Sequence, residues 1–446
     1  MFGYSIVQTV RSHAHRLDKP LREKLLNLYK PFKWTPCIFH KLLEGSIKRF
    51  KKLSVIIEFE QGCYEEGCKE VNKVLNRRSR NGLKSHFSRI CCCCADITPK
   101  GLEDVLSHCH HIRRIYLNRE VRAFLDVAVE SANAAHIVRN NMVLTGKGVT
   151  IAVVDTGIYP HSDLSGRIVN FVDFINQRTE PYDDNGHGTH CAGDAAGDGA
   201  ASMGKYRGPA PEANLVGVKV LDKMGAGSLE TVMQGIDWCI QYNENNPFDK
   251  IDIISLSLGS QAQPHKKEND DPMVKIVEEA WTSGIVVVVA AGNEGPESKT
   301  IASPGISDQV ITVGALDDSN TAGEKDDDEV ASFSSRGPTI YDQIKPDILA
   351  PGVNIISLRA PNSYLDKLQK TNRVGSDYFV LSGTSMATPI CAGVAALIKE
   401  WNPGATPQEI KDAIKSGPKL WTDRNQNIYG AGYIDAERSI PNDVED

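Results

Sequence analysis

Short, uninterrupted apolar runs recur through the C-terminal two thirds of the chain, and stretches with helical spacing separate them. Runs of this kind, rich in valine and isoleucine, are typical of strands buried on both faces of a parallel sheet. The helical stretches cover residues 228–243 and 272–284. This alternation predicts an α/β fold, a parallel sheet with helices on both faces. The predicted strands are 149–155, 214–221, 251–259, 284–292 and 310–316.

The most apolar helical stretch begins just after Ser385. Residues 387–401 are small or apolar with polar residues near the end, a pattern typical of a helix buried on nearly all sides. Ser385 would lie at the N-terminus of this helix, where unpaired backbone N–H groups and the helix dipole favour a developing negative charge. The same position also suits an ordinary helix N-cap, so this stretch alone leaves two interpretations open.

Residues 51–126 show a different pattern, in which short segments with strand-like apolar patterns alternate with short segments with helical spacing. This order predicts a small α+β domain with its helices on one face of a sheet. Residues 1–50 form a basic N-terminal extension with a weak helical pattern, and residues 127–446 form the larger domain. The elements predicted in the small domain are strands at 53–59, 86–97 and 112–125 and helices at 64–77 and 101–109.

Charge is divided unevenly between these parts. Residues 1–126 contain 24 lysines and arginines against 13 aspartates and glutamates, whereas residues 127–446 contain 26 against 44. The two parts therefore carry net charges of +11 and −18, and they would attract each other. Nucleic-acid binding is the alternative for the basic part. Its charges are scattered and no recognition motif accompanies them, so we expect no nucleic-acid partner.

The chain carries no pattern typical of export or membrane insertion. The first thirty residues lack the apolar core and cleavage site of a secretory signal, and no run of about 18 apolar residues occurs. The 11 cysteines are odd in number and four are consecutive at Cys91–Cys94, which favours free thiols over a disulfide framework. These features predict a cytoplasmic protein without a membrane partner. A metal or redox role for the four-cysteine run stays open as an alternative.

Polar residues with catalytic potential follow several of the predicted strands. Asp155 ends the run 149–155, Asn293 follows 284–292, and His187 lies in a glycine-rich turn before a stretch of small residues. Because ligands bind at the carboxyl ends of parallel strands, we expect these side chains to meet Ser385 there. Each has an ordinary explanation as a turn or surface residue. Together they supply the nucleophile, base, orienting carboxylate and amide donor that acyl transfer needs.

Six motifs carry a resemblance to a known family. DTGI at 155–158, HGTHCAG at 187–193 and GTSMATP at 383–389 resemble the catalytic signatures of the subtilisin-like serine proteases, in the same Asp, His, Ser order. The resemblance covers about residues 127–440 and implies a subtilisin-like fold and a serine endopeptidase. The other three matching segments are SLG at 257–259, AGNEG at 291–295 and SFSSRGP at 332–338.

The resemblance implies a role for each candidate residue. Ser385 would be the nucleophile, His187 its general base and Asp155 the residue that orients the imidazole. Asn293 would join the backbone N–H of Ser385 in the oxyanion hole. His190 is the alternative base, but the family pattern favours His187. For a protein or peptide substrate, Ser257, Leu258, Gly259 and Gly227 would present backbone, and Ala291, Gly292 and Glu294 would border a roomy first pocket of broad specificity.

The small front domain resembles, more weakly, the propeptides of this family. That resemblance implies a zymogen whose N-terminal domain is an intramolecular inhibitor and folding chaperone. Our hypothesis is that the tail of this domain, near residues 122–131, lies across the active site and is cut by it. The chemistry requires no cofactor. A structural calcium ion stays open, with Asp163 as a candidate ligand, although residues 198–211 do not match the family's calcium-binding loop. The acidic segment 317–329 fits a solvated loop better than a calcium site.

Two other classes of function stay open. A catalytically silent member would retain its front domain and act as a binding or regulatory module, and a fluorophosphonate probe would then leave Ser385 unlabelled. An esterase would more typically carry its serine in a GxSxG turn, whereas this serine lies in GTSMA.

Overall fold

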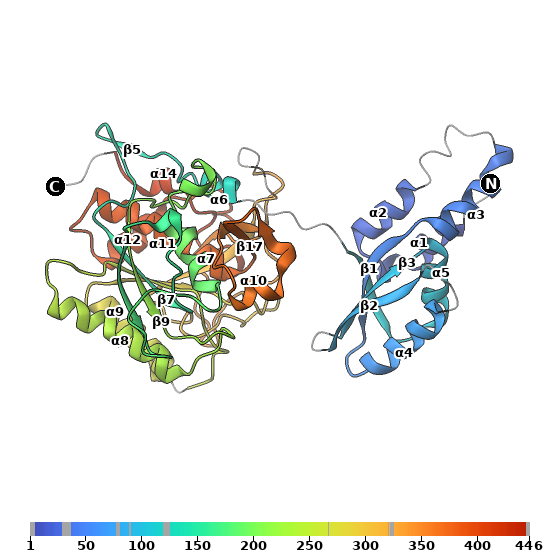
Figure 1. Cartoon of the computed structure of the whole chain (residues 1–446), viewed down its shortest axis with the longest axis horizontal. Coiled ribbons are helices and arrows are strands. Elements are labelled where there is room, and N and C mark those ends of the chain that lie inside the picture. Colours follow the sequence, from blue (N-terminus) through green and yellow to red (C-terminus); the bar gives the residue numbers. More distant parts are fainter. Residues whose placement is uncertain are drawn as a thin grey trace. The chain divides into compact units, whose positions relative to one another are not determined.

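The computed structural model describes residues 5–28, 37–76, 81–88, 91–118, 125–265, 267–319, 321 and 325–442. Contacts divide the chain into two compact units, residues 1–121 and 122–446 (Figure 1).

The larger unit is built on an eight-stranded sheet with the order β13-β12-β11-β10-β7-β9-β8, and β14 lies beside β12. The pairings are parallel except that of β13 with β12. Five of these strands are those predicted from the apolar runs; β8, β13 and β14 were not predicted. The strands are β7 (Thr150–Asp155), β8 (Ile168–Asp173), β9 (Asn214–Lys219), β10 (Ile253–Leu256), β11 (Val286–Ala290), β12 (Ile311–Asp317), β13 (Glu329–Val330) and β14 (Ile348–Pro351).

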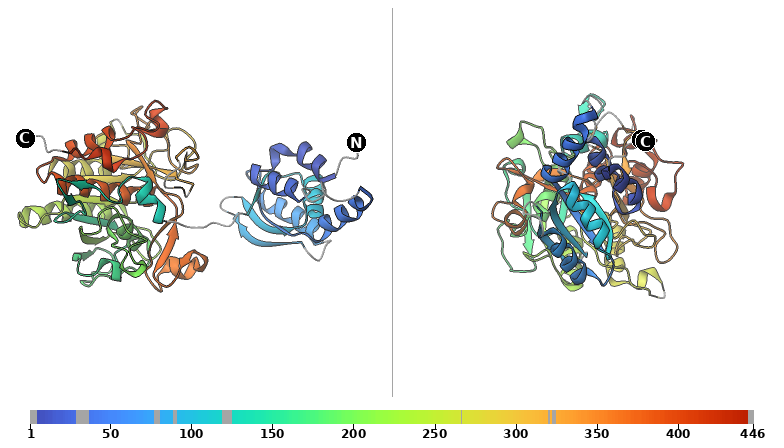
Figure 2. Two further views of the ribbon diagram at one scale, coloured as in Figure 1. Left: turned by 90° about the horizontal axis from the view of Figure 1, so that it is seen from above. Right: turned by 90° about the vertical axis from the view of Figure 1, so that its right-hand side faces the viewer.

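Helices cover both faces of this sheet (Figure 2). Gly235 of α8 lies against Val154, whereas Gly188 of α7 lies against Asp155. Because neighbouring residues of a strand point to opposite faces, α7 and α8 lie on opposite sides of β7. The apolar helix α11 packs against α7 and the central strands, and α9 packs against α8. The long helices are α7 (His187–Ala196), α8 (Leu229–Asn245), α9 (Pro272–Thr282), α11 (Thr384–Trp401) and α12 (Pro407–Ser416).

A small three-stranded sheet leads into α11. Its order is β15-β17-β16, and β17 ends at Leu381, four residues before Ser385. The remaining elements of this unit are β5 (Val138–Arg139), β6 (Met142–Val143), β15 (Ile355–Leu358), β16 (Arg373–Val374), β17 (Tyr378–Leu381), α6 (Leu125–Ser131), α10 (Tyr364–Leu368), α13 (Gln426–Tyr429), α14 (Ala436–Ser439) and 3-10 turns at 162–164, 200–202, 268–270 and 370–372.

The smaller unit has a four-stranded antiparallel sheet in the order β2-β3-β1-β4. From β1 onward its elements follow the βαββαβ order of ferredoxin-like domains. The elements are α1 (Ser5–Ser12), a 3-10 turn at 14–16, α2 (Lys19–Asn27), α3 (Cys37–Phe50), β1 (Leu53–Phe59), α4 (Tyr64–Leu75), β2 (Gly82–Phe87), β3 (Cys92–Ile97), α5 (Pro99–His108) and β4 (Ile112–Leu117).

The N-terminal helices contribute to the core of this smaller unit. Leu17, Leu21 and Leu25 are buried in the same apolar cluster as Ile115 of β4. Asp18 caps α2 by accepting from the N–H of Leu21, and the same carboxylate oxygen accepts from the N–H of Leu117. Residues 17–25 are thereby attached to the edge strand of the sheet.

Two predicted strands of this unit differ in the structure. The prediction of one strand over 86–97 was wrong, because β2 ends at Phe87 and β3 begins at Cys92. Cys91 has a φ of 52°, a turn conformation that interrupts the apolar pattern of the cysteines. The strand predicted over 112–125 ends at Leu117; residues 119–124 lie outside the described part, and α6 begins at Leu125.

Among the helices described, none is long and apolar enough to cross a membrane.

Candidate active site

Asp155 and His187 meet at the carboxyl end of the central strand. Asp155 is the last residue of β7 and is fully buried, while His187 is the first residue of α7. Gly186, with a φ of 105°, turns the chain into that helix in a conformation that favours glycine. Nδ1 of His187 lies 2.8 and 3.0 Å from the two carboxylate oxygens of Asp155. A proton on Nδ1 is thereby held by the carboxylate, which leaves Nε2 as the nitrogen that can exchange protons.

The environment of His187 raises its affinity for a proton. Burial by itself disfavours the imidazolium, but the adjacent Asp155 carboxylate outweighs burial, and the pKa of His187 lies well above its ordinary value. The imidazole side chain is 23% exposed, so solvent and a substrate can reach it. This pair can accept a proton and stabilise the resulting cation.

Ser385 lies in the first turn of α11 and faces the same cleft as His187. Its hydroxyl donates to the carbonyl oxygen of Ser257 at 3.1 Å, and the hydroxyl of Ser257 donates to the carbonyl of Ser385 at 2.8 Å. In this rotamer of Ser385, the hydroxyl makes no hydrogen bond with His187, which is also among the described residues. Rotation of the Ser385 side chain is needed to bring the hydroxyl to the imidazole, as is common in proteases without substrate.

Two N–H donors converge beside Gly383. A Cβ atom built on Gly383 would lie 3.6 Å from Nδ2 of Asn293 and 3.6 Å from the backbone nitrogen of Ser385. Oδ1 of Asn293 is held by the N–H and hydroxyl of Thr384, at 3.0 and 3.1 Å. Because Oδ1 is fixed in this way, Nδ2 is the atom of the amide that can donate into the cleft that Asn293 and Ser385 both line.

A cleft of about 1000 Å³ contains these groups and most of the predicted substrate-binding residues. Ala291 is the exception. It is fully buried in a cluster with Val274, Ile301 and Ile306, and Ala290 lines the cleft in its place, because adjacent residues at the end of β11 point to opposite sides. The predicted residues that line the cleft are His187, Gly227, Ser257, Leu258, Gly259, Gly292, Asn293, Glu294 and Ser385.

A buried carboxylate not singled out in the sequence supports the segment before His187. One oxygen of Asp183 accepts from the hydroxyl of Thr156 at 3.0 Å and from the N–H of Gly186 at 2.8 Å. The other accepts from the N–H and hydroxyl of Thr189, at 2.9 and 2.6 Å. Burial raises the pKa of Asp183, although these donors oppose the shift. Asp183 thus joins the residue after Asp155 to the first turn of α7.

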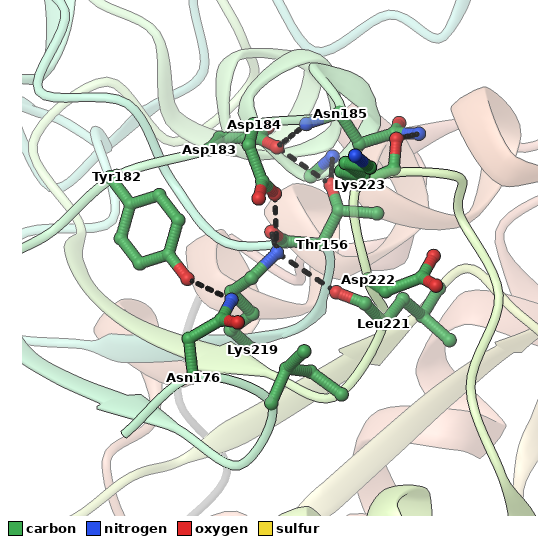
Figure 3. A network of polar contacts seen from close by, with 12 residues as sticks. Thr156, Asn176, Tyr182, Asp183, Asp184, Asn185, Lys219, Leu221, Asp222 and Lys223 are labelled. Carbon is green, nitrogen blue, oxygen red and sulfur yellow. Dashed lines mark hydrogen bonds and ion pairs between the residues drawn. The ribbon is translucent and has the colours of Figure 1, made fainter. Parts of the chain in front are cut away.

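Lys219 is a buried cation beside Asp155, its partner across the β7–β9 pairing. Its side chain is fully buried, and Nζ donates to the carbonyl of Thr156 at 2.6 Å, to Oδ1 of Asp184 at 2.7 Å and to the carbonyl of Leu221 at 2.9 Å (Figure 3). One ammonium group therefore joins the turns that follow β7 and β9 to the segment before His187. The signal in the sequence was a single lysine within an apolar run, since lysine is rarely buried without partners.

His190 and Cys191 lie under the site. His190 is fully buried, with Nδ1 2.9 Å from Asp194 and Nε2 3.1 Å from the carbonyls of Ile355 and Phe379. Both of its ring nitrogens are thus occupied within the fold. Cys191 Sγ lies 3.8 Å from Nδ1 of His187, and burial raises the pKa of this thiol to about 11. The thiol is therefore protonated at neutral pH and is a poor nucleophile.

Asp163, the candidate calcium ligand, is bonded to groups of the protein itself. Its Oδ1 accepts from the N–H of Ala201 at 2.9 Å, and its Oδ2 accepts from the hydroxyl of Tyr378 at 2.6 Å. Burial opposes ionisation of Asp163, but His161, Tyr378 and Ala201 outweigh it and lower its pKa. Calcium takes six to eight oxygen ligands. A carboxylate whose two oxygens already accept hydrogen bonds from N–H and O–H donors does not fit such a site. The acidic segment 317–329 lies partly outside the described residues.

Comparison with known proteins shows to which protein family the chain belongs. Residues 146–432 match the model of the subtilase family, and the chain belongs to this family of subtilisin-like serine proteases. Over 441 residues, 99% of this chain and 100% of the relative, it is 64% identical to serine protease AprX of Bacillus subtilis (strain 168). Subtilisin Savinase of Lederbergia lenta is 37% identical over 306 residues, which cover 69% of this chain and 94% of the relative.

Solved structures agree with this assignment. A cold adapted subtilisin-like serine proteinase matches with a TM-score of 0.51 and 28% identity, over 70% of this chain and 98% of that chain. Sphericase matches with a TM-score of 0.52 and 30% identity, over 65% of this chain and 92% of that chain. The predicted family, α/β fold and enzyme class are thereby confirmed.

Proposed function

We propose that this chain is a serine endopeptidase that hydrolyses peptide bonds through an acyl-enzyme on Ser385. The observation that carries the proposal is the pairing of His187 with the buried Asp155 in a cleft where Ser385 and the Asn293 amide also lie. An acyl transfer needs a base, a nucleophile and donors for the oxyanion, and these four residues supply them.

The proposed reaction begins with rotation of the Ser385 hydroxyl from Ser257 toward His187. The imidazole takes the hydroxyl proton as the serine oxygen attacks the carbonyl carbon, and the carbonyl electron pair moves to the oxyanion. The Asn293 amide and the backbone N–H of Ser385 donate to that oxyanion. The intermediate then expels the amine, which takes the proton from His187. A water molecule, activated by the same base, releases the acid and restores the serine.

For specificity, we propose a broad preference with a roomy first pocket. The small residues Ala290 and Gly292 would leave room for large apolar side chains, and the carboxylate of Glu294, which also lines the cleft, would accept a cationic one. The backbone of Ser257, Leu258 and Gly259, together with that of Gly227, would pair with an extended peptide in the cleft that they line. Cleavage of a peptide library tests this proposal, and a strict requirement for one small residue would contradict it.

For the front unit, we propose a propeptide that inhibits the enzyme and assists its folding. The ferredoxin-like order of its elements and its net charge of +11, against −18 for residues 127–446, support the proposal. We expect wild-type protein to be shortened at the start of residues 122–131, because Ala128 and Val129 of α6 are buried in the core of the larger unit, and a Ser385→Ala variant to remain at full length. Mass spectrometry of both proteins reads the N-terminus directly, and equal lengths would exclude self-processing.

For location, we propose the cytoplasm. The ten cysteines characterised in the described part of the chain are all free thiols, which favours a reducing compartment. Fractionation of cells that produce a tagged protein tests this.

A fluorophosphonate probe tests the central proposal. We expect one adduct, on Ser385, that is absent from Ser385→Ala and strongly reduced in His187→Ala. A folded wild-type protein with no adduct would favour the catalytically silent alternative, in which the chain acts as a binding module.

A further inference from the structure

A second group of metal-ligating side chains lies in the smaller unit, where the turn after β1 meets the start of β4. Glu60 and Cys63 lie on the turn that joins β1 to α4, and His111 immediately precedes β4. One donor atom of each residue lies within 4.8 Å of the other two. Glu60 is exposed, and Cys63 and His111 are partly exposed, so an ion in solution can reach all three.

The backbone around this group is fixed by hydrogen bonds. The N–H of Glu60 donates to the carbonyl of His111 at 2.9 Å, and the N–H of Cys63 donates to the carbonyl of Glu60 at 3.0 Å. The carbonyl of Cys63 accepts from Gly67 in the first turn of α4. The three side chains therefore project from a preformed frame, which lowers the entropy cost of holding them round an ion.

Further carboxylates lie beside the histidine. Nε2 of His111 is 4.0 Å from Oε2 of Glu66 and 4.0 Å from Oε1 of Glu70. Glu70 is held in place, because its other oxygen accepts from the N–H of His110 at 3.1 Å. Either glutamate can supply a fourth ligand or orient the imidazole ring, as carboxylates commonly do at metal-bound histidines.

We propose that Glu60, Cys63 and His111 bind a zinc ion. Thiolate, imidazole and carboxylate are the three protein ligands of Zn²⁺, with bond lengths of roughly 2.0–2.3 Å in a tetrahedron. Two such ligands lie about 3.6 Å apart, so these donors, all within 4.8 Å of one another, need to approach by at most about 1 Å. Exposed and partly exposed side chains such as these achieve that by rotation about single bonds. Calcium and magnesium, which prefer oxygen ligands alone, fit this set poorly.

The described part of the chain contains three competing groups, and none fits a zinc ion as well. Glu268, Glu278 and Asp308 lie within 4.8 Å of one another but offer carboxylates alone, the ligands that calcium and magnesium prefer. Asp155, His187 and Cys191 also lie within 4.8 Å of one another, but Asp155 and Cys191 are buried and Nδ1 of His187 is bonded to the carboxylate. In the four-cysteine run, Cys92 and Cys93 are buried, and burial raises the pKa of the Cys92 thiol to about 11. The metal site therefore belongs to Cys63, outside that run.

Cobalt binding to the full-length Ser385→Ala protein tests the proposal, because that variant excludes self-cleavage and Co²⁺ reports its ligands by absorption. We expect one equivalent to produce the visible bands of tetrahedral Co²⁺ and a thiolate-to-cobalt charge-transfer band, both lost when Zn²⁺ displaces it. Cys63→Ser should abolish the charge-transfer band. His111→Ala and Glu60→Gln should each weaken binding by at least about tenfold.

Matched variants distinguish this site from the active-site group and from the four-cysteine run. Cys94→Ser and His108→Ala change a partly exposed thiol and an exposed imidazole of the same unit, and both should bind Co²⁺ like the parent protein. Cys191→Ser should also leave the spectrum unchanged. Loss of the band in Cys191→Ser with retention in Cys63→Ser would place the ion at the active site and overturn the proposal. A parent protein that binds no stoichiometric Co²⁺ or Zn²⁺ would overturn it as well.

Discussion

Each unit of this chain contains a carboxylate, a histidine and a cysteine within 4.8 Å of one another, but the two groups differ in burial. In the catalytic unit, Asp155 is fully buried and both of its oxygens face Nδ1 of His187. In the front unit, Glu60 is exposed, and its hydrogen bonds with Cys63 and His111 run through the backbone and leave its carboxylate available. The comparison indicates that a buried carboxylate hydrogen-bonded to the imidazole suits such a group to proton transfer. An exposed group without that hydrogen bond can bind a metal ion instead.

Replacing the histidine of each group should give the largest difference in kcat between the two groups. We expect His187→Ala to lower kcat by about 10⁶-fold, the magnitude of the same change in subtilisin, because the serine then lacks its base. His111→Ala, the matched change in the front unit, should leave kcat unchanged once the enzyme is processed. Active-site titration followed by peptide hydrolysis measures both, and comparable losses would refute the division of roles.

Removing the amide donor should give the next largest effect. We expect Asn293→Ala to lower kcat by about 10²- to 10³-fold, the range known for this change in subtilisin, with a much smaller change in KM. The amide binds charge that develops only in the transition state, so substrate binding is little affected. Near-normal kcat would remove Asn293 from the mechanism.

Replacing Lys219 tests whether catalysis by Asp155 and His187 depends on the buried ammonium group beside them. We expect Lys219→Met to lower kcat by about 10- to 100-fold, because the turn after Asp155 and the segment before His187 lose their common donor. Lys223→Met changes an exposed lysine in the turn after β9 and serves as the control.

The assay for Lys219 must separate positioning from folding. Rates should be expressed per titrated active site, since removal of a buried donor also costs about 1–3 kcal/mol of stability. A loss of folded protein with an unchanged rate per site would limit Lys219 to a structural role.

The pH dependence of the enzyme should show the effect of Asp155 on His187. The base must be neutral, and its pKa is raised, so kcat/KM should increase with pH and reach half its maximum above the ordinary histidine value of 6.5. Asp155→Asn removes the carboxylate that raises this pKa, so the acid limb should move to lower pH while the rate falls. Glu60→Gln should not move it. An acid limb at the same pH in Asp155→Asn would contradict the assigned cause.

Much of the larger unit could be predicted because its signals are local. Strands buried on both faces, such as β7 and β11, are continuous apolar runs. The candidate polar residues lie at or just after the carboxyl ends of these runs. Strand β8 lacked that signal, because four of its six residues are only partly buried or exposed. Strands β2 and β3 merged in the prediction, because the cysteines continue the apolar pattern through the turn at Cys91.

The sequence by itself determined the family, the α/β architecture and the candidates Asp155, His187, Asn293 and Ser385, because spacing and residue type carry that information. Only the tertiary structure decided that Ala290 rather than Ala291 lines the cleft, that Lys219 joins two turns to the segment before His187, and that His111 meets Cys63. These facts depend on which way a side chain points and which strands lie side by side. Strand register and chain packing set both, and residues far apart in the sequence determine them.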